Sequence, residues 1–359
     1  IDLEAFLAGN DILLFPENVP VAIEKIKQAL TSEVLSEKRL EHSVKKILQY
    51  KYKAGLNNYE PIELENLAND LNSPDNEALH YKLMQNALTV LKNKNEILPI
   101  KDIENQKLAY FKLGDDYETD FVETLRKYTD ITVIEEDSLG LVGVLDKLKD
   151  FSTVIVGYHK SNSHAWRKHD FSTEELTWLY EIARTKNVIL TVFARPYSLM
   201  AVQTFENIEG VVVSYQNNKV AQRLTAQLIF GSNKANGRLP VSIGGDLVTG
   251  YGLDTKTIDR LGFDIPENVG MKTQVLAKID SIALDAIEKQ IAPGMQILVA
   301  RHGKVIYQKA FGYHTYENQM AVENTDLYDV ASLTKIMATL PLVIQDFDNE
   351  KLDLNTKLS

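Results

Sequence analysis

Ser332 and Lys335 are the residues of this sequence whose types and spacing most directly suggest chemistry. They belong to the phrase Ser332-Leu333-Thr334-Lys335, at the start of a helix expected from about Ser332 to Phe347. Residues three apart on a helix share a face, so the lysine amine can lie beside the serine hydroxyl. A neutral amine in that place can take the hydroxyl proton. The pattern therefore predicts a nucleophilic serine at Ser332, with Lys335 as its base.

The same spacing occurs at Ser43-Val44-Lys45-Lys46, so the motif alone is not specific. Roughly one chance match is expected in a chain with this many serines and lysines. Ser43 falls in the middle of an ordinary helix expected from about Ser36 to Lys53, whereas Ser332 follows a hairpin and a loop and opens its helix. This context favours Ser332 as the nucleophile, and the alternative is a serine that only caps a helix.

A second group of candidate residues follows a predicted strand in the segment Tyr158–Phe171. The group consists of His159, Lys160, His164, Arg167, Lys168 and His169. We expect an exposed polar loop or an interface loop, and a loop that faces a substrate site is the alternative. Metal binding by the three histidines is disfavoured, because their spacing fits no common ligand pattern. Asp115 and Asp116 also follow a strand, and we interpret them as solvated acids of a turn.

The elements that must position these residues form a clear pattern between about residues 85 and 245. Short, nearly all-apolar, β-branched runs alternate with amphipathic segments, as expected for strands that are covered on both faces. This alternation predicts a doubly wound, mostly parallel α/β sheet with right-handed crossovers. The expected strands are Leu108–Leu113, Ile131–Glu135, Thr153–Gly157, Val188–Phe193 and Val211–Tyr215. The expected helices lie near 117–128, 139–150, 173–186, 197–205 and 218–230.

The regions on either side of this sheet have a different pattern. Two helices, at about 19–30 and 36–53, lack partners that could bury their apolar faces, and residues 58–84 resemble a linker in composition. Residues 246–275 form a second expected linker. From 276 onward we expect a helix at Lys278–Gln290 and two strands, Met295–Arg301 and Lys304–Phe311, joined by the hairpin turn His302-Gly303.

Composition excludes several classes of function. The chain has 359 residues, a net charge of −11 and no cysteine. An acidic chain is a poor candidate for non-specific nucleic-acid binding. The lack of cysteine excludes disulfides, a thiol nucleophile and cysteine metal sites within these residues. No apolar run approaches the roughly 18 residues that a membrane span needs.

Residues 3–245 resemble glycoside hydrolase family 3. The phrase Ala8-Gly9-Asn10-Asp11-Ile12-Leu13-Leu14-Phe15-Pro16 is similar to the last barrel strand of that family, and Ser43–Leu48 to the helix that leaves the barrel. Ala87–Asn93 resembles the entry to its α/β sandwich domain, and Gly237–Ser242 the end of that domain. The resemblance implies that residues 1–57 are the last strand and helices of a truncated barrel, and that residues 85–245 are the sandwich domain.

The resemblance also bears on the type of glycosidase. In the glucosidase type a Gly-Glu phrase that carries the acid/base glutamate follows the third sandwich strand, and here that place holds Gly157-Tyr158-His159. Tyr215-Gln216-Asn217-Asn218 is more similar to the β-N-acetylhexosaminidase type. In that type a His–Asp pair on a barrel loop transfers the proton and a barrel aspartate is the nucleophile. We expect both to lie upstream of Ile1, so that the segment 158–171 is at most near the sugar site.

Residues 276–359 resemble the opening of the serine β-lactamase and penicillin-binding protein family. Pro293–Gly312 is similar to its first two strands, and Tyr328-Asp329-Val330-Ala331-Ser332-Leu333-Thr334-Lys335 to its nucleophile motif. The family's Tyr-x-Asn and late Lys-Thr-Gly elements have no counterpart after Ser332. The resemblance implies acylation at Ser332 with Lys335 as base.

The two resemblances together imply a bacterial hydrolase that cleaves terminal β-N-acetylglucosaminide links by a retaining mechanism, fused to a serine hydrolase. The expected substrate is a cell-wall glycan or muropeptide, and export to the periplasm is expected, with a cytoplasmic location as the alternative. No metal, nucleotide, flavin or other cofactor is implied. The alternative functions are a non-catalytic scaffold or docking fragment and a β-glucosidase-type family 3 enzyme.

Overall fold

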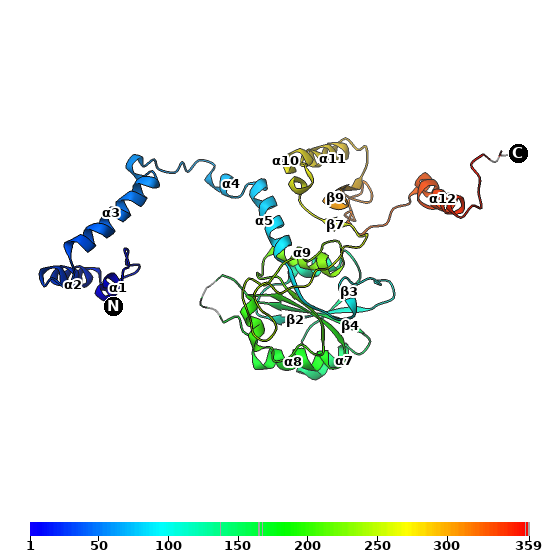
Figure 1. Cartoon of the computed structure of the whole chain (residues 1–359). Helices are drawn as coiled ribbons and strands as arrows, with labels where there is room; N and C mark the ends of the chain where they lie inside the picture. The colour runs from blue at the N-terminus through cyan, green and yellow to red at the C-terminus, as the bar shows by residue number, and fades with distance from the viewer. Residues whose placement is uncertain (137, 164–165, 167, 356, 358–359) are drawn as a thin grey trace. The chain divides into compact units, whose positions relative to one another are not determined.

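The computed structural model describes residues 1–136, 138–163, 166, 168–355 and 357. The chain forms two compact units, Ile1–Leu71 and Asn72–Ser359 (Figure 1). The boundaries that we predicted for the individual domains are finer than this division and stay predictions.

Helices make up the regular structure of the first unit. They are α1 (Asp2–Leu7), α2 (Val19–Thr31), α3 (Glu37–Lys53), the 3₁₀ turn η1 (Leu56–Asn58) and α4 (Leu67–Leu71). Asn18 caps α2 and Ser36 caps α3, since each side chain accepts a hydrogen bond from the backbone N–H three residues on. A small core of Phe6, Ala29 and Leu35 holds α1, α2 and the start of α3 together.

The expectation of a barrel strand at Ala8–Pro16 is wrong. These residues form turns and irregular structure, and Ile12 and Leu14 are exposed. A parallel strand needs neighbouring strands to pair its backbone N–H and C=O groups. Residues 1–71 are all described and contain no strand that could serve as that neighbour.

A six-stranded sheet lies at the centre of the second unit, and it confirms the predicted doubly wound, mostly parallel α/β class. Its strand order is β1-β6-β5-β4-β2-β3, in which β1 is antiparallel to β6 and the other pairs are parallel. The five predicted strands are all present. The bounds are β1 (Thr89–Asn93), β2 (Leu108–Gly114), β3 (Ile131–Ile134), β4 (Thr153–His159), β5 (Asn187–Phe193) and β6 (Ile208–Val213).

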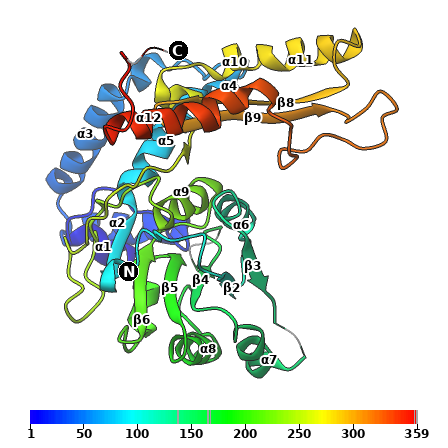
Figure 2. The ribbon, with the colours of Figure 1, turned by 90° about the vertical axis from the view of Figure 1, so that its right-hand side faces the viewer.

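Helices cover both faces of this sheet, as Figure 2 shows. One face packs on α5, α6 and α9, and the other on α7, α8 and the 3₁₀ turn η3. The strand side chains alternate between the two resulting cores, so both faces are apolar. The bounds are α5 (Pro74–Ala87), α6 (Thr119–Leu125), α7 (Gly140–Lys147), α8 (Thr173–Ala183), η3 (Pro196–Ala201) and α9 (Lys219–Ile229).

The segment expected as the first linker, residues 58–84, differs from that expectation. It contains α4 and most of α5, and α5 buries Tyr81 and Met84 in the core beside α9. Ser73 caps α5 and Pro74 occupies its first turn, which is a standard helix start. The many acidic and amide residues on the exposed side of α5 concealed its short apolar face.

The segment expected as the second linker, residues 246–275, also contains regular structure. It contributes β7 (Gly262–Phe263), the 3₁₀ turn η4 (Pro266–Val269) and most of α10 (Thr273–Leu276). β7 joins a three-stranded sheet in the order β7-β9-β8. The predicted helix and hairpin are present as α11 (Lys278–Glu288), β8 (Gly294–Arg301) and β9 (Lys304–Gly312).

The predicted helix from Ser332 to Phe347 is divided into three parts. A 3₁₀ turn, η5, spans Ala331–Leu333, a π-helical turn spans Lys335–Thr339, and α12 spans Leu340–Asp348. No helix within the described ranges is long and apolar enough to cross a lipid bilayer.

Candidate active sites

The Ser332 site is built on the first turn of the helical region 331–348. Lys335 Nζ lies 3.0 Å from Ser332 Oγ and donates a hydrogen bond to it. Ser332 lies inside η5, whose N-cap position is Val330, so its hydroxyl does not act as that cap. The preceding residue, Ala331, has a φ of 42°, and its N–H donates to Asp329 Oδ1 at 2.8 Å. The geometry thus places the two predicted residues in contact, with the lysine amine directed at the serine oxygen.

The surroundings of this pair are open. Every described residue from 331 onward is exposed, Ser332 and Lys335 included. An oxyanion hole and a substrate groove need further groups that cover the serine. The geometry therefore shows a serine with a lysine beside it, and the role of Ser332 as nucleophile stays a prediction.

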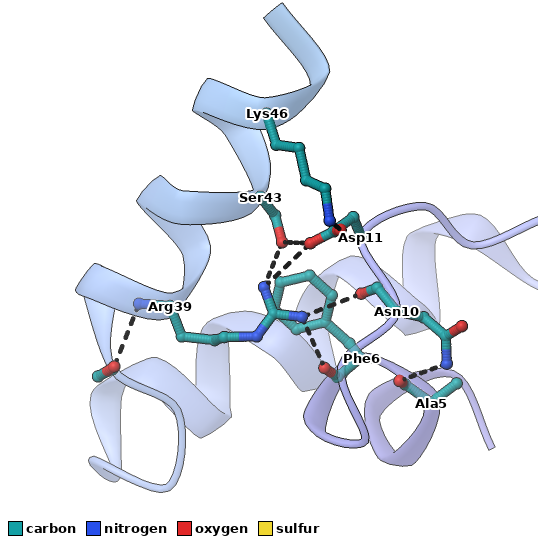
Figure 3. A network of polar contacts seen from close by, with 8 residues as sticks. Ala5, Phe6, Asn10, Asp11, Arg39, Ser43 and Lys46 are labelled. Carbon is teal, nitrogen blue, oxygen red and sulfur yellow. Dashed lines mark hydrogen bonds and ion pairs between the residues drawn. The ribbon is translucent and has the colours of Figure 1, made fainter. Parts of the chain in front are cut away.

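The second Ser-x-x-Lys match, at Ser43, has a different geometry (Figure 3). Ser43 is buried in α3 and donates a hydrogen bond of 2.7 Å to Asp11 Oδ1. Lys46 Nζ lies 2.6 Å from Asp11 Oδ2, and Arg39 also contacts Asp11 and Ser43. The hydrogen bonds from Lys46 and Ser43 lower the pKa of Asp11 to about 2.

This Asp11 network explains why the two motifs differ. The Lys46 amine is held by a carboxylate, which keeps it charged and raises its pKa. Arg39 adds a second cation, and its guanidinium lies over the Phe6 ring at 4.8 Å. The network ties α3 to the turn after α1, as expected of a structural ion cluster. The interpretation of Ser43 as part of an ordinary helix agrees with this geometry.

The carboxyl edge of the six-stranded sheet holds a second polar cluster. β2 ends before Asp115 and Asp116, β4 ends at His159, and Asn217 lies in the turn between β6 and α9. The strand order reverses between β2 and β4, and open α/β sheets bind ligands at such a point. Asn217 Nδ2 donates to Asp116 Oδ2 at 2.8 Å, and Asn217 Oδ1 lies 2.9 Å from His159 Nδ1.

The hydrogen bonds of this cluster determine the protonation state of His159. Asn217 Nδ2 also donates to Tyr117 O, so Asn217 Oδ1 must be the acceptor and His159 Nδ1 the donor. His159 Nε2 then accepts from the Tyr110 hydroxyl, at 3.0 Å. Burial lowers the pKa of His159 to about 4, although the hydrogen bond to Asn217 acts in the opposite direction. At neutral pH the ring is uncharged and both of its nitrogens are occupied.

The expectation of an exposed loop at Tyr158–Phe171 is therefore wrong for two of its histidines. His159 is fully buried in β4, where its ring stacks on Phe193 at 4.3 Å. His169 is also buried, and neither of its ring nitrogens has a hydrogen-bond partner among the described residues. Lys160 is paired with Glu175 at 3.2 Å. His164 and Arg167 lie outside the described residues.

Sequence reasoning missed most of the buried polar cluster. Tyr110 was part of an apolar strand, and Gln222 was part of a helix. Gln222 Nε2 donates to Asn217 Oδ1 at 2.7 Å, and Gln222 Oε1 accepts from the N–H of Phe121. The one available signal was Asn217, a polar residue in the turn between a predicted strand and a predicted helix. Within the described ranges no three His, Asp or Glu side chains gather as metal ligands.

The comparisons with known proteins match different parts of the chain. Residues 279–359 match the family model described as Beta-lactamase. Protein flp of Staphylococcus aureus, in strains NCTC 8325 and MRSA252, is 30% identical to this chain over 82 residues. That match covers 23% of this chain and 16% of flp, so the chain spans only a small part of the curated relatives it matches.

Solved structures resemble a larger part of the chain. A glycoside hydrolase family 3 β-N-acetylglucosaminidase from Paenibacillus sp. str. FPU-7 has a TM-score of 0.52 at 17% identity, covering 67% of this chain and 47% of that one. A β-glucosidase from Listeria innocua in complex with glucose has a TM-score of 0.52 at 18% identity, covering 67% of this chain and 36% of that one. The β-glucoside phosphorylase BglX has a TM-score of 0.52 at 16% identity, with 67% and 44% covered.

These findings confirm both parts of the resemblance. The chain has the fold of the C-terminal part of glycoside hydrolase family 3 structures, and its last part matches the β-lactamase family. At such low identities the structural likeness concerns the fold. Each match covers less than half of the solved structure, so the likeness does not extend to activity or substrate.

Proposed function

We propose that residues 276–359 are the nucleophile-bearing part of a serine hydrolase, in which Ser332 is acylated and Lys335 is the base. The observation that carries this proposal is the 3.0 Å contact between Lys335 Nζ and Ser332 Oγ at a helix start. The match of residues 279–359 to the Beta-lactamase family model supports it. Resemblance, rather than geometry, suggests that the substrate is a β-lactam, a peptide or an ester.

The proposed reaction is acyl transfer. The uncharged Lys335 amine takes the Ser332 proton as Oγ attacks the carbonyl carbon of an ester or amide. The leaving group departs with a proton, and water then releases the acid from the serine ester. The Ser332–Lys335 pair is exposed, so this chemistry needs further groups that cover the pair.

A serine-reactive fluorophosphonate tests the assignment on the full-length protein that contains residues 1–359. We expect one labelled serine, identified as Ser332 by peptide mass analysis, and no labelling of Ser332→Ala. Ser43→Ala is the matched control for the second motif and should keep full labelling. Labelling that survives Ser332→Ala and is lost in Ser43→Ala would overturn the assignment.

We further propose that the sandwich module, residues 74–245, belongs to a glycosidase of the β-N-acetylhexosaminidase type that acts by a retaining mechanism. The specific support is His159, at the place where the glucosidase type has its acid/base phrase. Its ring is buried, uncharged and fully hydrogen-bonded, so it is poorly suited to donate a proton to a glycosidic oxygen. This favours an enzyme whose proton donor comes from its barrel.

The structures with this fold include glucoside-active enzymes, so a β-glucosidase is the alternative activity. Chromogenic N-acetylglucosaminide and glucoside substrates distinguish the two on the full-length protein. We expect turnover of the first and none of the second, and His159→Asn should keep that turnover if the protein still folds. Turnover of glucosides alone would support the glucosidase alternative, and no turnover of either would support a scaffold. We also propose that the substrate is a cell-wall glycan and that the protein is exported from a bacterial cell.

A further inference from the structure

The segment of residues 258–269, named here the bracket segment, contacts both the sandwich module and the β7-β9-β8 sheet. Towards the sandwich module, Arg260 donates to three backbone carbonyls, those of Ile100, Lys101 and Phe230. The N–H of Ile258 donates to Gly231 O at 2.8 Å. These bonds join the bracket segment to the end of α9 and to the loop after β1.

A two-point polar contact involves Gln227, a buried residue of α9. Its Nε2 donates to Phe263 O at 2.9 Å, and its Oε1 accepts from the N–H of Phe263 at 2.8 Å. The side-chain amide therefore pairs with both backbone groups of Phe263, as a neighbouring strand would. Phe263 lies in β7, so an α9 side chain bonds the outer edge of the second sheet.

Strand β9 of the second sheet reaches the sandwich module as well. Lys304 Nζ donates to Ser232 O at 2.7 Å, and Ser232 is buried. Gly262 in β7 pairs with Lys304, and a methyl group on Gly262 would come within 2.3 Å of Lys304 Nζ. The absence of a side chain at residue 262 leaves the space through which the Lys304 amine passes.

Apolar contacts follow the same path. Ile265 packs on the core between the first sheet and α5, α6 and α9, whereas Val269, four residues later, belongs to the core between β9 and α10. The Phe263 ring lies edge-on to Tyr128 of the sandwich module, at 5.8 Å between centroids. The bracket segment is thus part of two hydrophobic cores within a single 3₁₀ turn.

We propose that the bracket segment holds the second sheet in one fixed orientation on the sandwich module, so that these two parts of the chain move as one body. The partner surface is the C-terminal end of α9 with the turn at Ser232, and Gln227 and Lys304 are its polar anchors. This inference concerns the arrangement of the modules and does not depend on either proposed activity. Modules within a chain ordinarily move relative to one another when their interface is small. The contacts of the bracket segment would instead keep these two modules in one arrangement.

Pulsed electron spin resonance distance measurement tests this on the whole chain. The chain contains no cysteine, so spin labels at Glu123→Cys in α6 and Gln308→Cys in β9 report one distance. Both positions are exposed. We expect a single narrow distance distribution for the doubly labelled chain. A broad distribution would overturn the proposal.

Variants identify the anchors. We expect the double variant Gln227→Leu, Lys304→Met to widen the distribution by about twofold or more, because docking would then leave the Phe263 N–H and two carbonyls unpaired. Lys309→Met is the matched control, since Lys309 lies on the same strand but pairs with Asp280 of α11. It should leave the width unchanged.

Amide hydrogen exchange provides a second readout that does not depend on the labels. Exchange at Phe263 should be slow in the parent chain and faster in Gln227→Leu, while the core strand β5 stays protected. Equal widths for the parent and the double variant, or unchanged Phe263 exchange, would contradict the assignment of these anchors.

Discussion

Asn217 is the residue on which the polar cluster at the sheet edge depends. Its amide makes four hydrogen bonds, to Asp116, Tyr117 O, His159 and Gln222, which is the full capacity of the group. Buried polar networks stabilise a fold when every member is satisfied and destabilise it when one is not. Asn217 therefore joins the ends of three strands and the start of α9.

We expect Asn217→Ala to lower the free energy of unfolding by about 2–3 kcal/mol, because His159 and Gln222 would each lose a buried partner. Urea unfolding followed by circular dichroism measures this. Asn105→Ala, in an exposed turn, is the control and should change the value by less than about 0.5 kcal/mol. Equal effects of the two substitutions would contradict the account.

His159 predicts a pH dependence of stability. Burial lowers its pKa in the folded chain to about 4, from an ordinary value of 6.5. Between these values the unfolded chain binds a proton that the folded chain does not, so stability is full above pH 6.5 and falls as the pH drops towards 4. The expected loss is about 3 kcal/mol.

Urea titrations at pH 7 and pH 4.5 measure most of this loss. His159→Gln should reduce the difference between the two pH values, and His42→Gln, which changes an exposed histidine of α3, should not. The pKa of His169 is also lowered by burial, so the reduction is expected to be partial. A difference that His159→Gln leaves unchanged would assign the pH dependence to other groups.

The residue-scale contacts were largely beyond sequence reasoning. Ser332 and Lys335 are three residues apart, and local helix geometry alone brings them together, so their contact could be predicted. His159 and Asn217 are separated by 58 residues, and only the strand order brings them into contact. A polar residue after a strand is ordinarily solvated, so nothing local indicated that His159 is buried.

At the scale of elements, β2 and β4 approach each other closely at Gly114, where β2 ends beside His159 of β4. Its φ is +92°, and a Cβ there would lie 2.0 Å from the carbonyl oxygen of His159. The next residue, Asp115, donates its N–H to the same oxygen at 3.1 Å. Both the conformation and the space therefore require glycine.

We expect Gly114→Ala to destabilise the chain by more than about 3 kcal/mol, because the strand ends must separate. Gly140→Ala is a matched control, since Gly140 has a φ of +56° but nothing within 4 Å of its Cβ position. That change should cost about 1–2 kcal/mol, the price of the backbone conformation alone. Thermal unfolding of both variants tests this, and similar losses would show that strand crowding is unimportant.

The elements themselves were largely predictable. The five parallel strands are apolar runs covered on both faces, and such runs are distinctive in a sequence. β1 escaped prediction because its apolar run is broken by Lys92 and Asn93, which are only partly buried, and its pairing with β6 links residues more than a hundred positions apart. The expected barrel strand at Ala8–Pro16 was inferred from resemblance, whereas a strand exists only where a partner pairs with it.

At the scale of the whole molecule, the first compact unit, Ile1–Leu71, contains an exposed irregular stretch near its boundary with the second. Residues 59–66 are exposed and contain no helix or strand. Protease cleavage concentrates in exposed segments of this kind. The first unit is stabilised by its own core and by the Asp11 network.

We expect the Glu-specific protease from Staphylococcus to cut first after Glu63 or Glu65, because Glu60 precedes a proline. The product would be a fragment that begins at Leu64 or Asn66 and contains the whole second unit. Mass analysis of an early time point identifies it. Early cuts after the exposed Glu174 of α8 or Glu123 of α6 instead would contradict this division of the chain.

The two edges of the six-stranded sheet are protected from pairing with a foreign strand in different ways. Beyond β1, the N–H of Leu253 donates to Val90 O, so a loop of the same chain already occupies part of that edge. The opposite edge is β3, only four residues long. Short or covered edges leave little template for a foreign strand. Both edges are therefore poor templates for edge-to-edge aggregation. At one edge β3 is short. At the other edge β1 is partly covered by the loop at Leu253, which leads into the bracket segment.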